Sequence, residues 1–321
     1  MASGERVFLT GATGFVGSHI LRELLDSGYA VRALVRDGKR VDDRAEHVVG
    51  DLRNVGAFAS ALRGCRYLVH CAALYTFSPR AAHEIAAVNV EGTASLLLAA
   101  HLGGAERAVL TSSSATLGHA EGRYHRSKLD QERTAFAARI PTVALLPTAP
   151  VGPGDAKPTP TGKLVRDFAR GKILAKAPGS GGMNLVAVED VARAHVAALQ
   201  QGRAGARYPI GGENLSMDEI WAMLAEITGK PMPAWRAPYA LAYVAGCADE
   251  LRSRISGAEP DVPLEGVRLS RERMYADSSS AQRDLDYRPT PVRDALVRAV
   301  AWFRENGYVD GSMQRDDAAA G

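Results

Sequence analysis

The chain has 321 residues, of which 46% are hydrophobic and 23% charged, a balance typical of a globular protein and not of a disordered or collagen-like one. Its formal net charge of +3 is spread without a basic block, which argues against nucleic-acid binding. Cys65, Cys71 and Cys247 lack metal-ligand spacing, so we expect no metal site or disulfide framework and a reducing, cytoplasmic location. Neither the N-terminus nor the apolar stretch 239–248 predicts a signal peptide or an integral membrane segment.

The first half of the chain alternates β-type runs with helical patterns. We expect strands at 6–10, 30–35, 47–49, 67–71, 107–112 and 141–146, and helices at 15–27, 55–62, 82–102 and 124–138. This alternation predicts an α/β fold with a doubly wound parallel sheet of the Rossmann type, in a first domain of residues 1–157.

The pattern changes at a Pro/Gly-rich crossing. Beyond it we expect helices at 161–170, 189–200, 216–228 and 290–307, and a strand at 184–188. These elements predict a smaller, mixed α/β substrate domain over residues 158–312. Residues 184–200 are expected to pack back on the first domain, and residues 313–321 to form a flexible tail.

A glycine-rich turn, GATGFVG, joins the first predicted strand to the first helix. Gly11 permits a tight turn, Gly14 lets the backbone approach a pyrophosphate, and Gly17 lets helix and strand pack closely. The spacing is GxxGxxG, and the alternative is a structural turn without a ligand. We therefore predict a dinucleotide site, with contacts from Gly11, Thr13, Gly14, Phe15, Val16 and Gly17.

The end of the second strand indicates which dinucleotide is bound. An arginine there suits the 2′-phosphate of NADP, whereas an acidic residue suits the ribose of NAD. Arg36 has this place, with basic residues at 39–40 behind it, but Asp37 allows NAD(H) instead. We favour NADP(H). After the third strand, Asp51-Leu52 is expected near the adenine, although Asp51 also suits a cap of the next turn.

Two groups of residues are candidates for the chemistry. Tyr124 and Lys128 have the YxxxK spacing, which places them on one face of a helix, where the ammonium lowers the pKa of the phenol and makes it a usable acid/base. Ser112–Ser114 end a parallel strand, where a hydroxyl can stabilise a reacting oxygen. His125 and His195 show no partner in the sequence.

The motifs TGATGFVG, GDL, NVEGT, TSSSATLG and YHRSK resemble the extended short-chain dehydrogenase/reductase family. In the second half, PTAPVGPGDAKPTPTGK, NLVAVEDVA and IGGENLSMDEI are similar to the hopanoid-associated sugar epimerase group, which is related to dihydroflavonol 4-reductases. The resemblance covers nearly the whole chain and is more specific for the family than for a substrate.

The resemblance implies roles for particular residues. Ser113 would be the catalytic serine, with Ser114 as the alternative, Tyr124 the acid/base and Lys128 its partner. Asn89 would sit behind the cofactor or satisfy a helix kink. A homodimer through the helices bearing Asn89 and Tyr124 is also implied. Further cofactor contacts would be Ala72 and Ala73 beside the adenosine half and Pro147 beside the nicotinamide.

The chain departs from the family pattern in two places. Only eleven positions separate Ser113 from Tyr124, shorter than usual for the family, so either the substrate mouth is unusually open or residues are missing from this stretch. Nucleotide-sugar epimerases usually carry an asparagine where this chain reads PTAP, and only Arg166 and Arg268 are candidates for binding a substrate diphosphate.

Three functions remain open from the sequence. The leading one is an NADP(H)-dependent oxidoreductase that interconverts a carbonyl and an alcohol of a small molecule by hydride transfer. The second is a nucleotide-sugar epimerase or dehydratase that retains its NAD(P). The third is a catalytically silent dinucleotide-sensing protein, which is disfavoured because such proteins typically lose the tyrosine or the lysine.

Overall fold

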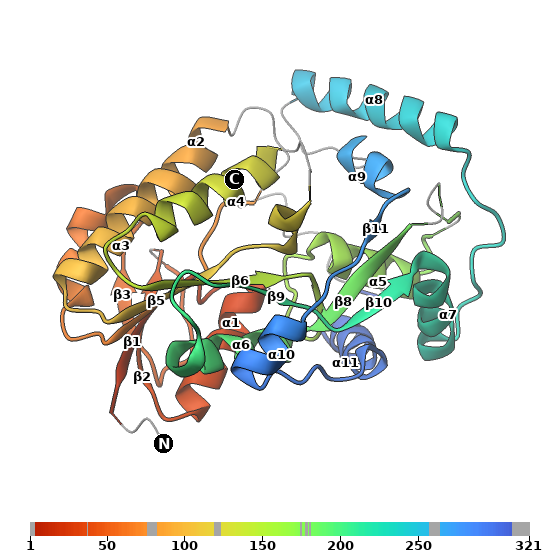
Figure 1. The fold of residues 1–321 in the computed structure, drawn as a ribbon. Helices are drawn as coiled ribbons and strands as arrows, with labels where there is room; N and C mark the ends of the chain where they lie inside the picture. Colours follow the sequence, from red (N-terminus) through yellow and green to blue (C-terminus); the bar gives the residue numbers. More distant parts are fainter. Residues whose placement is uncertain are drawn as a thin grey trace.

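The structure is a computed structural model that describes residues 4–36, 38–75, 82–118, 123–173, 175–176, 179, 181–256 and 264–309. A seven-stranded parallel sheet in the order β3-β2-β1-β4-β5-β6-β9 forms its centre (Figure 1). The strands are β1 (Arg6–Thr10), β2 (Ala30–Val35), β3 (Glu46–Val49), β4 (Tyr67–His70), β5 (Arg107–Thr111), β6 (Thr142–Pro147) and β9 (Arg207–Ile210). The order reverses direction at β1, so the crevice at the carboxyl ends of β1 and β4 is the expected ligand site.

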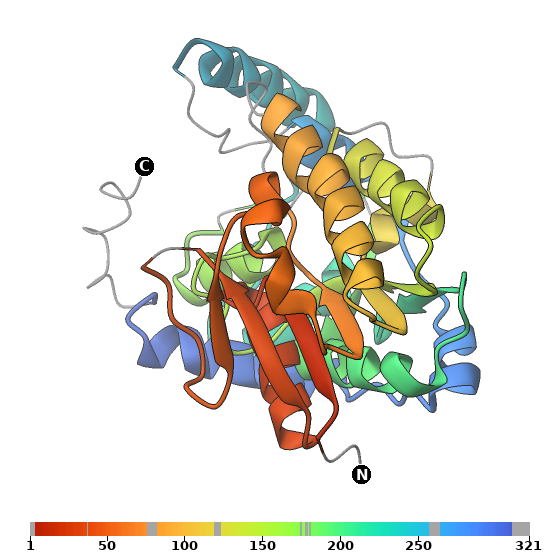
Figure 2. The same cartoon turned by 90° about the vertical axis from the view of Figure 1, so that its left-hand side faces the viewer.

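Helices cover both faces of this sheet (Figures 1 and 2). On one face α1 (Phe15–Asp26) packs against α6 (Val188–Gln201), with α10 (Ser279–Leu285) alongside. On the other lie α3 (Gly92–Leu102) and α4 (Arg123–Phe136). The expected Rossmann-type doubly wound sheet is confirmed.

A second, mixed sheet holds β7 (Ala149–Val151), β8 (Gly182–Ala187), β10 (Glu213–Ser216) and β11 (Arg273–Met274). Three helices build its core, α5 (Pro160–Ala169), α7 (Met217–Thr228) and α11 (Val292–Glu305). Two further helices, α8 (Tyr239–Ser256) and α9 (Leu264–Leu269), lie at its outer side (Figure 1). Strand β7 precedes residue 157 but joins this second sheet, and β9 follows residue 157 but joins the first sheet. The division of the chain into two domains at residue 157 remains a proposal.

Two predicted helices differ in the structure. Residues 55–62, expected as a regular helix, belong to two 3₁₀ segments, η1 (Leu52–Ala57) and η2 (Ala59–Leu62). Asn54 leaves helical geometry at φ −140° and ψ 64°, and Gly56 disfavours a continuous helix. The helix expected over 82–102 consists of α2 (Ala82–Ala86), a π-helical segment η4 (Ala87–Glu91) and α3.

This run from His83 to Leu102 is the one described helix whose length and apolar composition would suffice to cross a membrane. Its inward side packs on the sheet, where Leu96, Leu97 and Ala100 belong to the core. Packing on the sheet accounts for the apolar residues on this inward side, as in other core helices.

Candidate active site

The glycine turn is shaped by close backbone contacts. Gly11 has φ +81°, and a Cβ there would lie 2.7 Å from the Ala72 nitrogen on β4's extension. A Cβ on Gly17 would lie 2.0 Å from the Gly11 carbonyl oxygen. Both glycines are therefore required for the first strand, the first helix and the Ala72 segment to approach one another.

The N-terminus of α1 offers an anion site. Gly14 is its N-cap and has no side chain that could accept a hydrogen bond. The amides of the first turn, from Phe15, Val16 and Gly17, therefore have no side-chain cap. Thr13 and Gly14 are exposed at this end. An uncapped helix N-terminus behind a glycine turn suits the pyrophosphate of a dinucleotide, because free N–H groups and the helix dipole both favour the anion.

Basic side chains, together with Asp42, line the neighbouring cavity of about 300 Å³, which Thr13 also lines. Arg22 from α1 and the pair Lys39-Arg40 contribute to its wall. Arg36 lies exposed directly after β2, while Asp37 is outside the described residues. Arg22 was not expected from the sequence, although its place on the helix after the glycine turn would have indicated it.

Asp51 has a structural partner. Its carboxylate accepts the Arg53 amide at 2.8 Å, caps η1, and pairs with the Arg53 guanidinium. These hydrogen bonds lower the pKa of Asp51. Leu52 is buried behind it. The capping role expected as the alternative is present in the structure, and an adenine contact stays a prediction.

The serine turn after β5 is tied to α4 by a buried carboxylate. Glu132 is 4% exposed and accepts hydrogen bonds from the Ser112 and Thr116 hydroxyls and from Arg207 on β9. Arg207 also donates to the Thr116 carbonyl at 3.1 Å. Ser113 lies between these anchored residues, half-buried, as the N-cap of a short 3₁₀ segment. Ser112 is occupied by Glu132, which leaves Ser113 the better placed candidate.

Lys128 is buried on α4 beneath the carboxyl end of β5. Its Nζ donates to the Thr111 carbonyl and to Gln131 Oε1, each at 2.9 Å. Burial lowers the pKa of Lys128 to about 8. Tyr124 lies in the first turn of the same helix, but its side chain is outside the described residues, as are residues 119–122 of the short connection before it.

A continuous set of buried polar groups runs along the carboxyl ends of the central strands. His70, at the end of β4, lies 2.7 Å from the Thr10 hydroxyl and 2.8 Å from the Thr93 hydroxyl. Gln131 Nε2 donates to Thr93 at 3.0 Å, and its oxygen receives Lys128. Burial lowers the pKa of His70 to about 3, so this imidazole is neutral.

Asn89 connects the π-helical segment to the chain that follows β4. It lies in the π-helical segment, fully buried, and both accepts from the Leu74 amide at 2.7 Å and donates to the Leu74 carbonyl at 3.1 Å. The side chain thereby holds the strand extension that carries Ala72 and Ala73, both half-buried. This geometry accounts for a polar residue at the helix irregularity and does not itself show a catalytic role.

His195 has buried partners that the sequence did not indicate. One ring nitrogen lies 2.7 Å from the Thr111 hydroxyl and the other 2.7 Å from the Val191 carbonyl. Burial lowers the pKa of His195 to about 4. His195 thus supports Thr111, whose carbonyl receives Lys128. Pro147, on the next strand, ends β6 at the same edge of the sheet.

The fold and these contacts define a Rossmann enzyme of the nicotinamide-dependent oxidoreductase type. Residues 7–211 match the model of the NAD dependent epimerase/dehydratase family. The chain belongs to this family, and its expected identification as an extended short-chain dehydrogenase/reductase is confirmed.

Two curated relatives and one solved structure align along almost their full lengths. A putative dihydroflavonol 4-reductase of Synechocystis is 37% identical over 96% of this chain and 97% of its own. Sterol demethylase protein B of Methylococcus capsulatus is 34% identical over 94% and 99%. The crystal structure of gox2253 is 35% identical, with a TM-score of 0.81 over 95% of this chain and 99% of that one.

Proposed function

We propose that this protein is an NADP(H)-dependent oxidoreductase that interconverts a carbonyl and an alcohol of a small molecule. The observation that carries the proposal is the buried Lys128, which lies at the carboxyl end of β5, on the same side of the sheet as the glycine turn after β1. The bound nicotinamide would supply the chemistry of hydride exchange with the substrate carbon. The protein's own residues must then handle one proton and the developing charge on oxygen.

Each candidate catalytic residue has a separate task in this proposal. Tyr124, one helical turn before Lys128, gives or takes the proton of the substrate oxygen. Lys128 favours the phenolate of Tyr124 by its charge and binds the nicotinamide ribose. Ser113 donates a hydrogen bond to the same oxygen as charge develops. Tyr124→Phe should retain cofactor binding and lose turnover by at least a hundredfold, the lower bound of about 10² that acid–base catalysis contributes.

The preference for NADP(H) is supported by Arg36 and by the basic wall of Arg22, Lys39 and Arg40 beside the glycine turn. A 2′-phosphate in this region would be held by several guanidinium and ammonium groups. Fluorescence titration should give tighter binding of NADPH than of NADH. Arg36→Ala should weaken NADPH binding about tenfold and leave NADH unchanged; equal binding of both nucleotides by the original protein would refute the preference.

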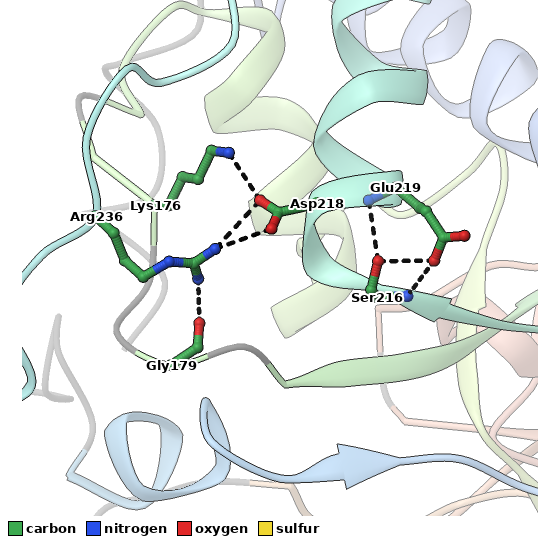
Figure 3. Close-up of polar contacts among 6 residues, drawn as sticks. All are labelled: Lys176, Gly179, Ser216, Asp218, Glu219 and Arg236. Atoms are coloured by element: carbon green, nitrogen blue, oxygen red, sulfur yellow. Dashed lines mark hydrogen bonds and ion pairs between the residues drawn. The ribbon is translucent and has the colours of Figure 1, made fainter.

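We further propose an apolar substrate. Lys176 and Arg236, on neighbouring segments beside the second sheet, are both paired with Asp218 at 2.7 and 3.0 Å (Figure 3). Arg166 is paired with Asp167, and Arg268 is hydrogen-bonded to Tyr243. Arg166 and Arg268, the candidates for binding a substrate diphosphate, thus have protein partners already, as do Lys176 and Arg236.

A cavity lined mostly by apolar residues, with Lys230 in its wall, lies between the end of α5 and the segment that follows α7. Its volume is about 240 Å³, and its lining includes Phe168, Ile173 and Met232. One relative is named sterol demethylase protein B, which supports an apolar substrate. A screen of apolar ketones and secondary alcohols against nucleotide sugars, followed by NADPH absorbance and with Tyr124→Phe as control, tests the proposal. Turnover of nucleotide sugars alone would refute it.

The family also contains epimerases and dehydratases, which gives the second candidate function. An epimerase retains its nucleotide and returns the hydride, so oxidised NAD(P) bound after purification would favour it. An exchangeable nucleotide with net oxidation of NADPH would favour the reductase. If neither function is found and nucleotide binding alone persists in Tyr124→Phe, the protein is a dinucleotide sensor.

We also propose a homodimer through α3 and α4. Leu98 and Leu102 on α3 are 54% and 77% exposed, an arrangement that a partner copy would cover. Sedimentation should give a dimer, and Leu102→Asp should yield a monomer. A monomeric original protein would end this proposal without touching the others.

A further inference from the structure

The amine of Lys128 is held by uncharged acceptors. Its two hydrogen bonds go to the Thr111 backbone carbonyl and to the Gln131 side chain. Within the part of the chain that the structure describes, no ion pair involves this nitrogen. Glu132, four residues after Lys128 on the same helix, is engaged with the serine turn and Arg207 instead. The position of the amine therefore depends on the hydrogen bonds that it donates to the Thr111 carbonyl and to Gln131 Oε1 rather than on a charged partner.

The orientation of Gln131 is itself determined. The residue is fully buried, so water does not satisfy its carboxamide. Its nitrogen donates to Thr93, whose hydroxyl donates onward to the Asn89 carbonyl at 2.8 Å. If the carboxamide of Gln131 were flipped, its NH₂ group would face the Lys128 ammonium, which is also a donor. Its oxygen would face the Thr93 hydroxyl, whose proton is already donated to the Asn89 carbonyl. Thr93 thus turns the Gln131 oxygen toward Lys128.

We propose that Gln131 is a positioning residue for Lys128, whose carboxamide, oriented by Thr93, keeps the amine against the Thr111 carbonyl at the cofactor edge. The spacing from Lys128 to Gln131 is i to i+3, which puts both side chains on one helix face. This inference rests on the proposed function, because the placement of Lys128 affects turnover only if the amine serves the reaction.

The ionisable groups around Lys128 sharpen the test. Among the described side chains they are His70 at the end of β4, Cys71 directly after it, and Glu132 on α4. Burial lowers the pKa of His70 and raises that of Cys71, so both are neutral near pH 7. A change at residue 131 therefore acts on an amine whose described titratable neighbours, apart from Glu132, carry no charge.

Two variants separate hydrogen bonding from shape. Gln131→Met keeps the length of the side chain but removes both the acceptor and the donor. Gln131→Glu keeps the acceptor and adds a carboxylate next to the amine. Asp130→Asn, an exposed position on the same helix, is the matched control.

The first readout is the titration of Lys128 in the full chain without cofactor. The chain has seven lysines, so ¹³C labelling at the lysine side-chain ends gives few signals, and Lys128→Met identifies the right one. In Gln131→Met the midpoint should fall by about half a pH unit or more, since the ammonium loses an acceptor. In Gln131→Glu it should rise by at least about one unit, because an opposite charge favours the protonated form. Asp130→Asn should leave it unchanged.

The second readout is the pH dependence of kcat with NADPH and a reducible ketone. Gln131→Met should lower kcat at least tenfold with a smaller change in KM, and in Gln131→Glu the limb governed by Lys128 should move with the NMR midpoint. Midpoints within 0.3 pH units of the original protein in both Gln131 variants would overturn the inference, whatever the turnover. Shifted midpoints in a protein that reduces no carbonyl would instead refute the proposed function and leave the positioning intact.

Discussion

Removal of the Glu132 carboxylate should both destabilise the protein and disturb the serine turn. In the structure this buried side chain accepts two hydroxyls and one guanidinium, joining α4, the Ser112–Thr116 turn and β9. Hydrogen bonds to a charged group contribute about 1.5–3 kcal/mol each, and removing one partner of a buried ion pair costs about 3–5 kcal/mol. The Arg207 side chain is 37% exposed, so water can solvate its guanidinium once the carboxylate is removed. For Glu132→Ala we therefore expect the free energy of unfolding to fall by about 3 kcal/mol, the lower end of this range.

Urea titration of the free energy of unfolding measures this loss. Arg133→Ala is the control, because its exposed pair with Asp130 should contribute less than about 0.5 kcal/mol. Glu132→Gln should lose roughly half as much as Glu132→Ala, since the amide keeps one acceptor. If kcat also falls in Glu132→Gln while nucleotide affinity is retained, the carboxylate orients Ser113. A Glu132→Ala protein as stable as the Arg133→Ala control would refute the reasoning.

Other outcomes follow from the same geometry. In the folded protein the pKa is about 3 for His70 and about 4 for His195, below the ordinary 6.5, so the unfolded chain takes up protons first as the pH falls. Each histidine should therefore lower the free energy of unfolding by about 2 kcal/mol between pH 7 and pH 5. In urea titrations at pH 7 and pH 5, His195→Gln should lose less stability between the two pH values than the original protein, and an equal loss would contradict this. Gly17→Ala should weaken NADPH binding at least tenfold, because its Cβ would meet the Gly11 carbonyl at 2.0 Å, whereas Gly118→Ala, with open space, should bind normally by fluorescence titration. Asp218→Asn should cost less than about 1 kcal/mol in urea, since the carboxylate is half-exposed; a larger loss would show that its two pairs are stronger than surface pairs.

The sequence was sufficient for the parts of the fold that depend on local patterns. The glycine turn and the alternation of strands and helices are local, and the structure shows both of them. The partners of buried polar groups were not predictable, because they meet through the order of strands in the sheet. Thus His195 looked isolated in the sequence, yet it lies against Thr111, eighty-four residues away.

Some features could have been inferred from spacing with one more step. Gln131 stands three residues after Lys128, so the helix period already placed their side chains together. What the period could not give was the choice between Gln131 and Glu132 as the partner of the amine, since i+3 and i+4 are both near. That choice depends on β9, whose Arg207 draws Glu132 toward the serine turn.

The adjacent side chains Gln131 and Glu132 bind different partners, and this has a chemical consequence. The carboxylate of Glu132 stabilises the serine turn, where its charge is matched by Arg207, while the neutral carboxamide of Gln131 contacts Lys128. A carboxylate in direct contact would keep the lysine charged well above neutral pH. With a neutral acceptor and deep burial, the pKa of Lys128 is lowered to about 8. The order Gln-Glu after the lysine, rather than Glu-Gln, is therefore what lets one helix turn both hold the serine segment and keep the amine titratable.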